Sequence, residues 1–238
     1  MKTILSTLLI TLALSTAATA TPTPSEVMEA FDRLADVPLW PGFDPTSYPV
    51  ALFTGEETVL YRFPATPEGF SPAPEADRLV HPGRHPMILA NTSTELDGVP
   101  LATVILTGSA DRTADSLGAL TIHELFHVYQ RREHPSWTAN EASLFGYPVA
   151  DEGLYALRLL ESDAMRRALA ADADAGRNAW AMRALRLRLD RMARMDEASA
   201  AYERRQELNE GLAQYVQDLA LGADPADRFP QQGWDPED

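Results

Sequence analysis

Cysteine is absent from this chain, and lysine occurs once, at Lys2. The lack of cysteine excludes disulfide bonds, and it also removes the residue to which a bacterial lipoprotein attaches its lipid anchor. After an N-terminal leader, about 218 residues would remain, which is enough to bury a hydrophobic core without covalent cross-links. Long apolar runs are scarce as well: the stretch from Ile4 to Leu14 is too short to cross a membrane comfortably, and no second candidate follows it.

The N-terminus has the pattern of a cleaved signal peptide. Lys2 supplies a positive charge, the apolar run follows, and Ala18-Thr-Ala has the small residues of a cleavage site. We therefore expect residues 1–20 to be removed and the mature chain to begin near Thr21. All other basic side chains are arginines and alanine is abundant, a bias typical of GC-rich bacterial genomes. The predicted destination is accordingly the bacterial periplasm or the external medium.

The charge balance is strongly acidic, with a formal net charge of −15. Nucleic acids and anionic membranes attract basic proteins, so this balance argues against either as a partner. We expect no stable membrane anchor, because no apolar segment beyond the leader could supply one. A solvated acidic surface is the ordinary explanation of such a charge, which therefore says little about the substrate.

The order of the predicted elements indicates one α+β domain over residues 21–238, because strands come first and helices follow. Residues 21–110 are expected to be mainly strand and loop, after a short helix at 25–35 with Ser25 as its N-cap. The expected strands are 49–54 and 57–63, forming a hairpin around Gly55, then 87–90 and 101–107, with an irregular loop at 64–86 and a turn at Asp97-Gly98. Within the helical part, 111–222, the expected helices are 113–133, 150–171, 175–195 and 198–221, the middle two as an antiparallel hairpin, before a tail at 223–238.

The most informative motif is His123-Glu-Leu-Phe-His127 within the helix expected at 113–133. Two histidines four positions apart on a helix share one face, about 6 Å apart, so both can bind one metal ion. Glu124 is then placed to hold and deprotonate a metal-bound water. We predict one Zn²⁺ per chain, with His123 and His127 as ligands and Glu124 as the general base.

A catalytic zinc site needs a third protein ligand and leaves a further position open. Metzincins place a third histidine six residues after the second, following an intervening glycine. Here Gln130 holds the glycine position and Glu133 the histidine position, while His134 lies too far along the helix axis to share the ion. The alternative is a glutamate from another helix.

Asn209-Glu-Gly-Leu-Ala-Gln-Tyr resembles the Asn-Glu-Gly-x-Ala-x-Tyr segment of the aminopeptidase-like gluzincins. Together with the histidine motif, this resemblance implies a zincin fold, zinc peptidase activity and Glu210 as the third ligand. The spacing departs from that family, because 82 residues separate His127 from Glu210, and gluzincins have a much shorter interval. Glu152 lies closer to the familiar spacing and remains the main rival, and Glu141 is a third option.

The sequence thus predicts an exported zinc metallohydrolase that acts on a peptide or protein substrate. In zincins an edge strand above the metal-binding helix pairs with the substrate, and residues 101–107 are the candidate for it. Glu207, one turn before Glu210, could support a ligand histidine. Candidates for stabilising the oxyanion are Tyr155, Tyr202, Tyr215 and His134. The alternative is a catalytically inactive protein on a zincin scaffold, which holds a metal or binds another protein.

Overall fold

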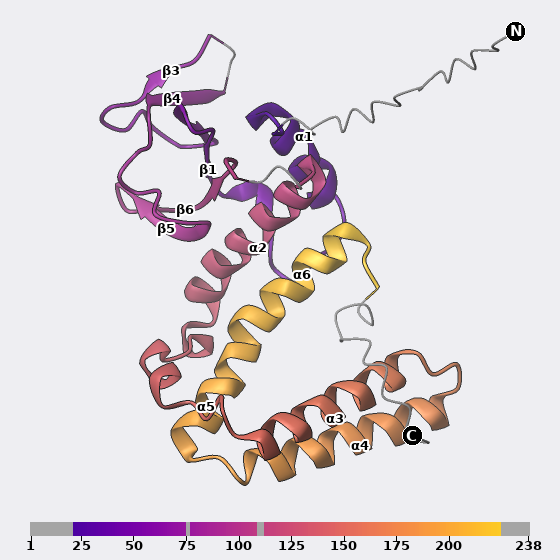
Figure 1. Cartoon of the computed structure of the whole chain (residues 1–238). Helices are drawn as coiled ribbons and strands as arrows, with labels where there is room; N and C mark the ends of the chain where they lie inside the picture. Colours follow the sequence, from indigo (N-terminus) through magenta and orange to yellow (C-terminus); the bar gives the residue numbers. More distant parts are fainter. Residues whose placement is uncertain (1–20, 75–76, 109–111, 225–238) are drawn as a thin grey trace, which may run out of the picture.

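The computed structural model describes residues 21–74, 77–108 and 112–224. The predicted signal peptide and nearly all of the predicted tail lie outside these residues. The predicted α+β class is confirmed, since a mixed sheet occupies the N-terminal half and helices follow it (Figure 1). The helices are α1 (Pro24–Ala35), α2 (Ala114–Glu133), α3 (Glu152–Leu169), α4 (Asp174–Met192), α5 (Glu197–Gln206) and α6 (Leu212–Leu221), with a π-helical turn at Glu207–Gly211 joining the last two.

The sheet has six strands in the order β3-β4-β2-β1-β6-β5. Their bounds are β1 (Val50–Phe53), β2 (Glu57–Tyr61), β3 (Ser71–Pro72), β4 (Arg78–Pro82), β5 (Thr92–Leu96) and β6 (Val99–Ile105). β1 and β6 are parallel, and every other pairing is antiparallel. Asp97 and Gly98, both with positive φ, make the tight turn between β5 and β6, as their sequence predicts.

Three predictions in this region were wrong. Residues 64–86, expected to be an irregular loop, contain β3 and β4, and residues 92–96, where no strand was expected, form β5. Residues 87–90 are not a strand; Ile88, with 1% of its surface exposed, packs against the sheet instead. Short strands that contain polar residues or proline carry little hydrophobic alternation, so sequence periodicity does not reveal them.

The first helix begins earlier than expected. Thr23, and not Ser25, is its N-cap: the Thr23 side chain accepts a hydrogen bond from the Glu26 backbone, and the Glu26 carboxylate accepts one from the Thr23 backbone. This reciprocal capping box, with Pro24 at the first helical position, satisfies free N–H groups at the helix start.

Strands β1 and β6 are buried on both faces. Their alternating residues Val50, Leu52, Ala102 and Val104 pack in the main core with α1, α2 and α6. On the opposite face, Ala51 and Leu101 join a smaller apolar cluster under the segment that contains Ile88. The buried, mostly apolar stretch 101–105 is therefore an interior strand, not the edge strand that we considered.

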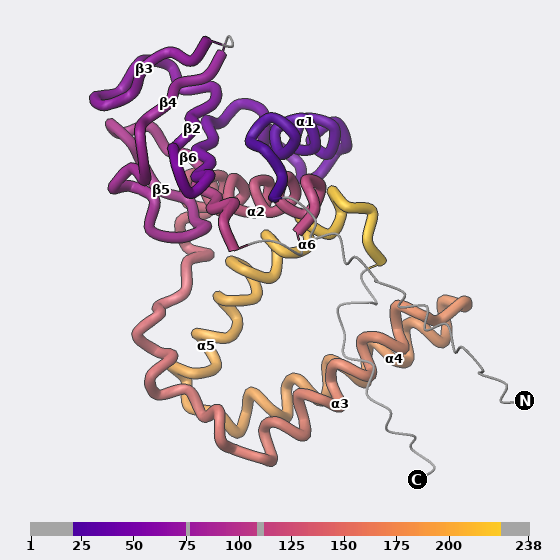
Figure 2. The backbone as a smooth tube through the Cα atoms, turned by 45° about the horizontal axis from the view of Figure 1, so that its top comes forward, coloured from indigo at the N-terminus to yellow at the C-terminus, as the bar shows by residue number. Residues whose placement is uncertain are grey.

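Helix α2 lies in the middle of the molecule. It runs between the sheet, α1 and α6 (Figures 1 and 2). Its apolar side chains pack with those of all three, and it is buried for most of its length. At Gly118 the backbone of α1 comes so close that a Cβ atom would lie 2.8 Å from the backbone nitrogen of Phe31. Such contacts leave α2 little freedom to shift or rotate.

The predicted antiparallel hairpin is formed by α3 and α4, which project from the rest of the molecule as an arm (Figures 1 and 2). Buried ion pairs join this arm to α5. Arg191 of α4, only 2% exposed, donates to both carboxylate oxygens of Glu203 at 2.6 Å and to Glu161 of α3 at 2.7 Å. A bidentate pair of this kind fixes orientation as well as distance.

No helix of the described residues is long and apolar enough to serve as a membrane span.

We expect Arg191→Met to lower the free energy of unfolding by about 3–5 kcal/mol, because two buried carboxylates lose their main counter-charge. Arg177→Met is the matched control, since Arg177 lies on the same helix in an exposed pair with Asp174. Its cost should stay below about 1 kcal/mol. Urea unfolding followed by circular dichroism measures the free energy of unfolding of both variants. Equal decreases in the two would contradict a stabilising role for the buried ion pairs of Arg191.

Candidate metal centre

Helix α2 presents His123 and His127 on one face. Its N-cap is Thr113, and the two histidines lie on successive turns, with ring centroids 4.8 Å apart. Their Nε2 atoms point toward each other at 3.1 Å. The side chains of both histidines are about nine-tenths buried, at 12% and 10% exposure. The helix therefore holds two imidazole nitrogens close together at a protected place.

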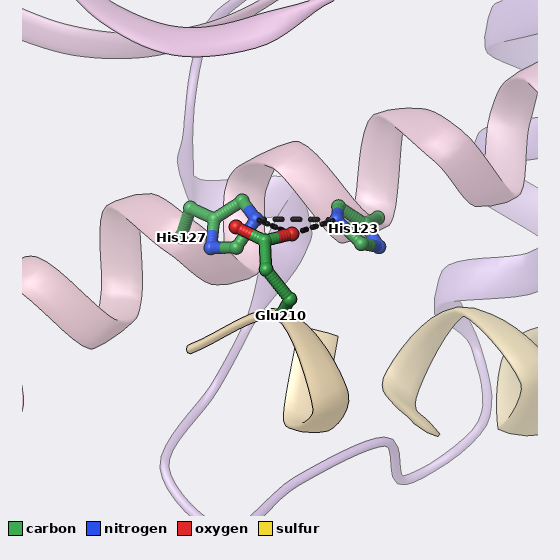
Figure 3. A group of neighbouring side chains, drawn as sticks. All are labelled: His123, His127 and Glu210. Atoms are coloured by element: carbon green, nitrogen blue, oxygen red, sulfur yellow. Dashed lines mark hydrogen bonds and ion pairs between the residues drawn. The ribbon is translucent and has the colours of Figure 1, made fainter. Parts of the chain in front are cut away.

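Glu210 comes from the π-helical turn between α5 and α6, where it faces both histidines (Figure 3). One of its carboxylate oxygens, Oε2, lies 3.4 Å from Nε2 of His127 and 3.6 Å from Nε2 of His123. The other oxygen accepts a hydrogen bond from the side chain of Asn209 at 3.0 Å. The structure thus brings together three of the residues predicted from the sequence, across the contact between α2 and the C-terminal helices.

The spacing of these three atoms suits a tetrahedral ion. With metal–ligand bonds of 2.0–2.1 Å, the ligand atoms of a tetrahedral zinc site lie about 3.3 Å apart. The observed separations are 3.1, 3.4 and 3.6 Å. Neutral imidazole nitrogens and a carboxylate oxygen are all ligands that zinc accepts. The residues present therefore fit the predicted metal, and two nitrogens with one oxygen leave a fourth position for water or substrate.

The local electrostatics favour positive charge between these groups. The neighbouring rings of His123 and His127 hold the pKa of Glu210 well below its ordinary value. Burial disfavours a charged His127 ring, but its contacts with Glu210 and Gln130 outweigh burial and raise the pKa of His127. The carboxylate of Glu210 that stabilises a protonated His127 would also stabilise a metal cation, because both place a positive charge next to it.

Glu124 lies beside this group, and only 7% of its surface is exposed. Burial raises the pKa of Glu124, while the neighbouring histidines oppose the increase. A cavity of about 290 Å³ contains Glu124 together with both histidines and Glu210. The other lining residues are Asn91, Thr92, Ser93, Arg131, Thr138 and Asn209. A larger hollow of about 820 Å³ lies elsewhere, between α1, β2 and β4, and contains none of the predicted site residues.

The edge strand next to this cavity is β5, not the stretch 101–107. β6 pairs with β1 on one side and β5 on the other, so β5 forms this edge of the sheet in the described residues. Ser93 of β5 lines the cavity and accepts a hydrogen bond from Arg131 of α2 at 2.6 Å. The sequence missed β5 because its residues, Thr-Ser-Thr-Glu-Leu, are mostly polar.

The remaining glutamates lie outside the group. Neither Glu152 nor Glu141 belongs to the set of converging ligand atoms. Glu152 opens α3, and Glu141 accepts hydrogen bonds from Tyr202 and Gln206. Glu207 pairs with Arg188 and Arg158, so it does not support a ligand histidine. That contact is made by Gln130, which sequence reasoning treated only as a departure from the metzincin pattern.

The residues considered for the oxyanion do not line the cavity. Tyr202 contacts Glu141, and His134 stacks on Trp137 with ring centroids 3.9 Å apart. Tyr155 and Tyr215 are exposed. Arg131 is the cationic side chain among the lining residues, and its i, i+4 spacing from His127 is the signal that could have identified it.

No protein-family model, no curated protein and no solved structure matches this chain. Its resemblance to gluzincins therefore rests on the two short motifs alone, and the side-chain geometry carries the functional argument.

We expect the mature chain, purified without added metal, to contain close to one zinc ion. Glu210→Gln removes a charged ligand, so zinc affinity should fall. Loss of a residue that only contacts a metal ligand typically lowers metal affinity by roughly 10- to 100-fold, and loss of a ligand should cost at least as much. Glu152→Gln is the matched control and should retain the metal. Metal analysis and a competition titration measure both variants. Loss of zinc in the Glu152→Gln variant alone would show that Glu152, and not Glu210, is the third ligand.

Proposed function

We propose that this chain is an exported zinc-dependent metallohydrolase, most simply a peptidase. The observation that carries the proposal is the meeting, in one cavity, of three suitable ligand atoms and a buried carboxylate that is not one of them. His123, His127 and Glu210 would hold the ion. Bound zinc would lower the pKa of a water molecule and polarise a carbonyl group.

Glu124 is the residue suited to proton transfer. It is adjacent to His123 in the sequence, it lines the cavity, and its pKa is raised by burial, so it can accept a proton more readily than a solvated carboxylate. In peptide hydrolysis Glu124 would orient the attacking water, accept its proton, and deliver that proton to the amine nitrogen of the leaving group. The carbon–nitrogen bond breaks in this step, and a carboxylic acid and an amine are released.

The position of β5 favours an extended peptide as the substrate. This edge strand borders the cavity through Thr92 and Ser93, and its outer side has no strand partner among the described residues. Backbone N–H and C=O groups on a free strand edge can pair with a peptide that lies alongside. Such pairing would bring a peptide bond to the cavity without requiring a particular side chain.

We expect Glu124→Gln to reduce kcat/KM on casein or a mixed peptide library by roughly 100- to 10,000-fold, because the amide cannot take up the proton. Zinc content should be unchanged, since Glu124 is not a ligand. Glu133→Gln is the matched control: it is the same change at an exposed position of α2, outside the cavity, and should retain activity.

The same experiment distinguishes the alternative function. If wild type and Glu133→Gln both bind zinc and neither hydrolyses any substrate, the chain is a metal-holding or protein-binding module on this scaffold. If neither binds zinc, the metallohydrolase proposal is wrong.

A further inference from the structure

Gln130 connects the two helical segments that carry the proposed ligands. It lies on α2, three residues after His127, and is only 2% exposed. Its Oε1 atom lies 2.8 Å from Nδ1 of His127. Its Nε2 atom donates to the backbone carbonyls of Leu208 and Asn209, at 2.8 and 2.9 Å. All three contacts are short enough to be ordinary hydrogen bonds.

These contacts determine which way the amide of Gln130 faces. Backbone carbonyls only accept hydrogen bonds, so the amide nitrogen must face Leu208 and Asn209. The amide oxygen then faces His127, and because this oxygen cannot donate, Nδ1 of His127 must carry the proton. In the neutral ring the lone pair is therefore on Nε2, which is the atom directed at Glu210 and His123.

The amide nitrogen of Gln130 affects the position of Glu210. The two carbonyls that it binds belong to the π-helical turn and immediately precede Glu210 in the chain. A π-helical turn inserts one extra residue and changes the direction in which the following side chains point. Fixing its carbonyls to α2 therefore fixes where Glu210 projects relative to the histidines.

We propose that Gln130 is a positioning residue that selects the Nδ1–H tautomer of His127 and sets the register of Glu210 against it. The part that concerns metal affinity rests on the proposed function. The tautomer of His127 does not, because it is a property of the metal-free chain as well.

Two variants separate the two ends of the amide. Gln130→Met has a similar length and removes all three hydrogen bonds, whereas Gln130→Glu keeps an acceptor opposite His127 and offers no amide donor to the carbonyls. Gln214→Met is the control, because Gln214 lies on α6, bonds to Asp218 and is not among the residues that line the cavity. Zinc affinity, imidazole ¹⁵N spectra of the metal-free chain at alkaline pH, and amide exchange across residues 208–212 are measured for each.

For wild type we expect a single Nδ1–H tautomer at His127, and the Gln214 control should match it. Gln130→Met should give a mixture of tautomers, faster amide exchange in the π-helical turn, and zinc affinity lower by about 10- to 100-fold. Gln130→Glu should keep the tautomer, but it should show faster exchange in the π-helical turn and a smaller fall in zinc affinity, because Glu210 loses its fixed register. A purely structural role would not change the tautomer while the fold is retained.

An Nε2–H tautomer in wild type would overturn the inference, and so would a Gln130→Met chain with unchanged tautomer and zinc affinity. If wild type binds no zinc, the proposed function fails, but the tautomer and amide-exchange data still test the role of Gln130. If Gln130→Met does not fold, amide exchange in Gln130→Glu provides the test. Exchange equal to that of wild type would then contradict the proposal that Gln130 sets the register of Glu210.

Discussion

The contact between α2 and the π-helical turn is the constraint on which the site depends. Two histidines on one helix need only local geometry, but Glu210 has to return across a long stretch of chain and arrive with its carboxylate within 3.4–3.6 Å of both rings. Helix α6 makes this possible by packing Ala213, Val216 and Ala220 into the same core as α2. Small and branched side chains at these positions allow close approach of the two helices. The distance between the candidate ligands is thus set by apolar packing, and their orientation by hydrogen bonds.

Charge explains why this contact is suited to a cation. Glu210 carries a negative charge, its pKa is held low, and the two imidazoles beside it are largely buried. A hydrogen bond between the two neutral imidazoles, or from one of them to Glu210, satisfies only two of these three atoms, which lie 3.1–3.6 Å apart. A metal ion can contact all three at once, and their nearly tetrahedral spacing suits one.

The parts of this structure that could be predicted from the sequence are those that depend on local patterns. Histidines four apart, apolar stripes with helical period, and the Asp97-Gly98 turn all act within a few residues, and each led to a correct element. β5 and the π-helical turn depend on distant partners: β5 is polar and becomes a strand by pairing with β6, and the turn is fixed by Gln130 of another helix. Gln130 itself gave no sequence signal, because an amide that satisfies three remote atoms looks like any glutamine on a helix.

The unusual spacing between His127 and Glu210 has a structural explanation. The α3/α4 arm occupies much of the intervening chain, yet no residue that lines the metal-site cavity comes from either helix. The arm is attached instead through Arg191 to Glu203 of α5 and through Arg188 to Glu207, the first residue of the π-helical turn. A hairpin at this point lengthens the chain between His127 and Glu210 without separating them, because its base is joined to α5. The gluzincin spacing is therefore a weak guide to which glutamate faces the histidines, whereas the residues around Glu210, which make the contact with α2, are the informative ones.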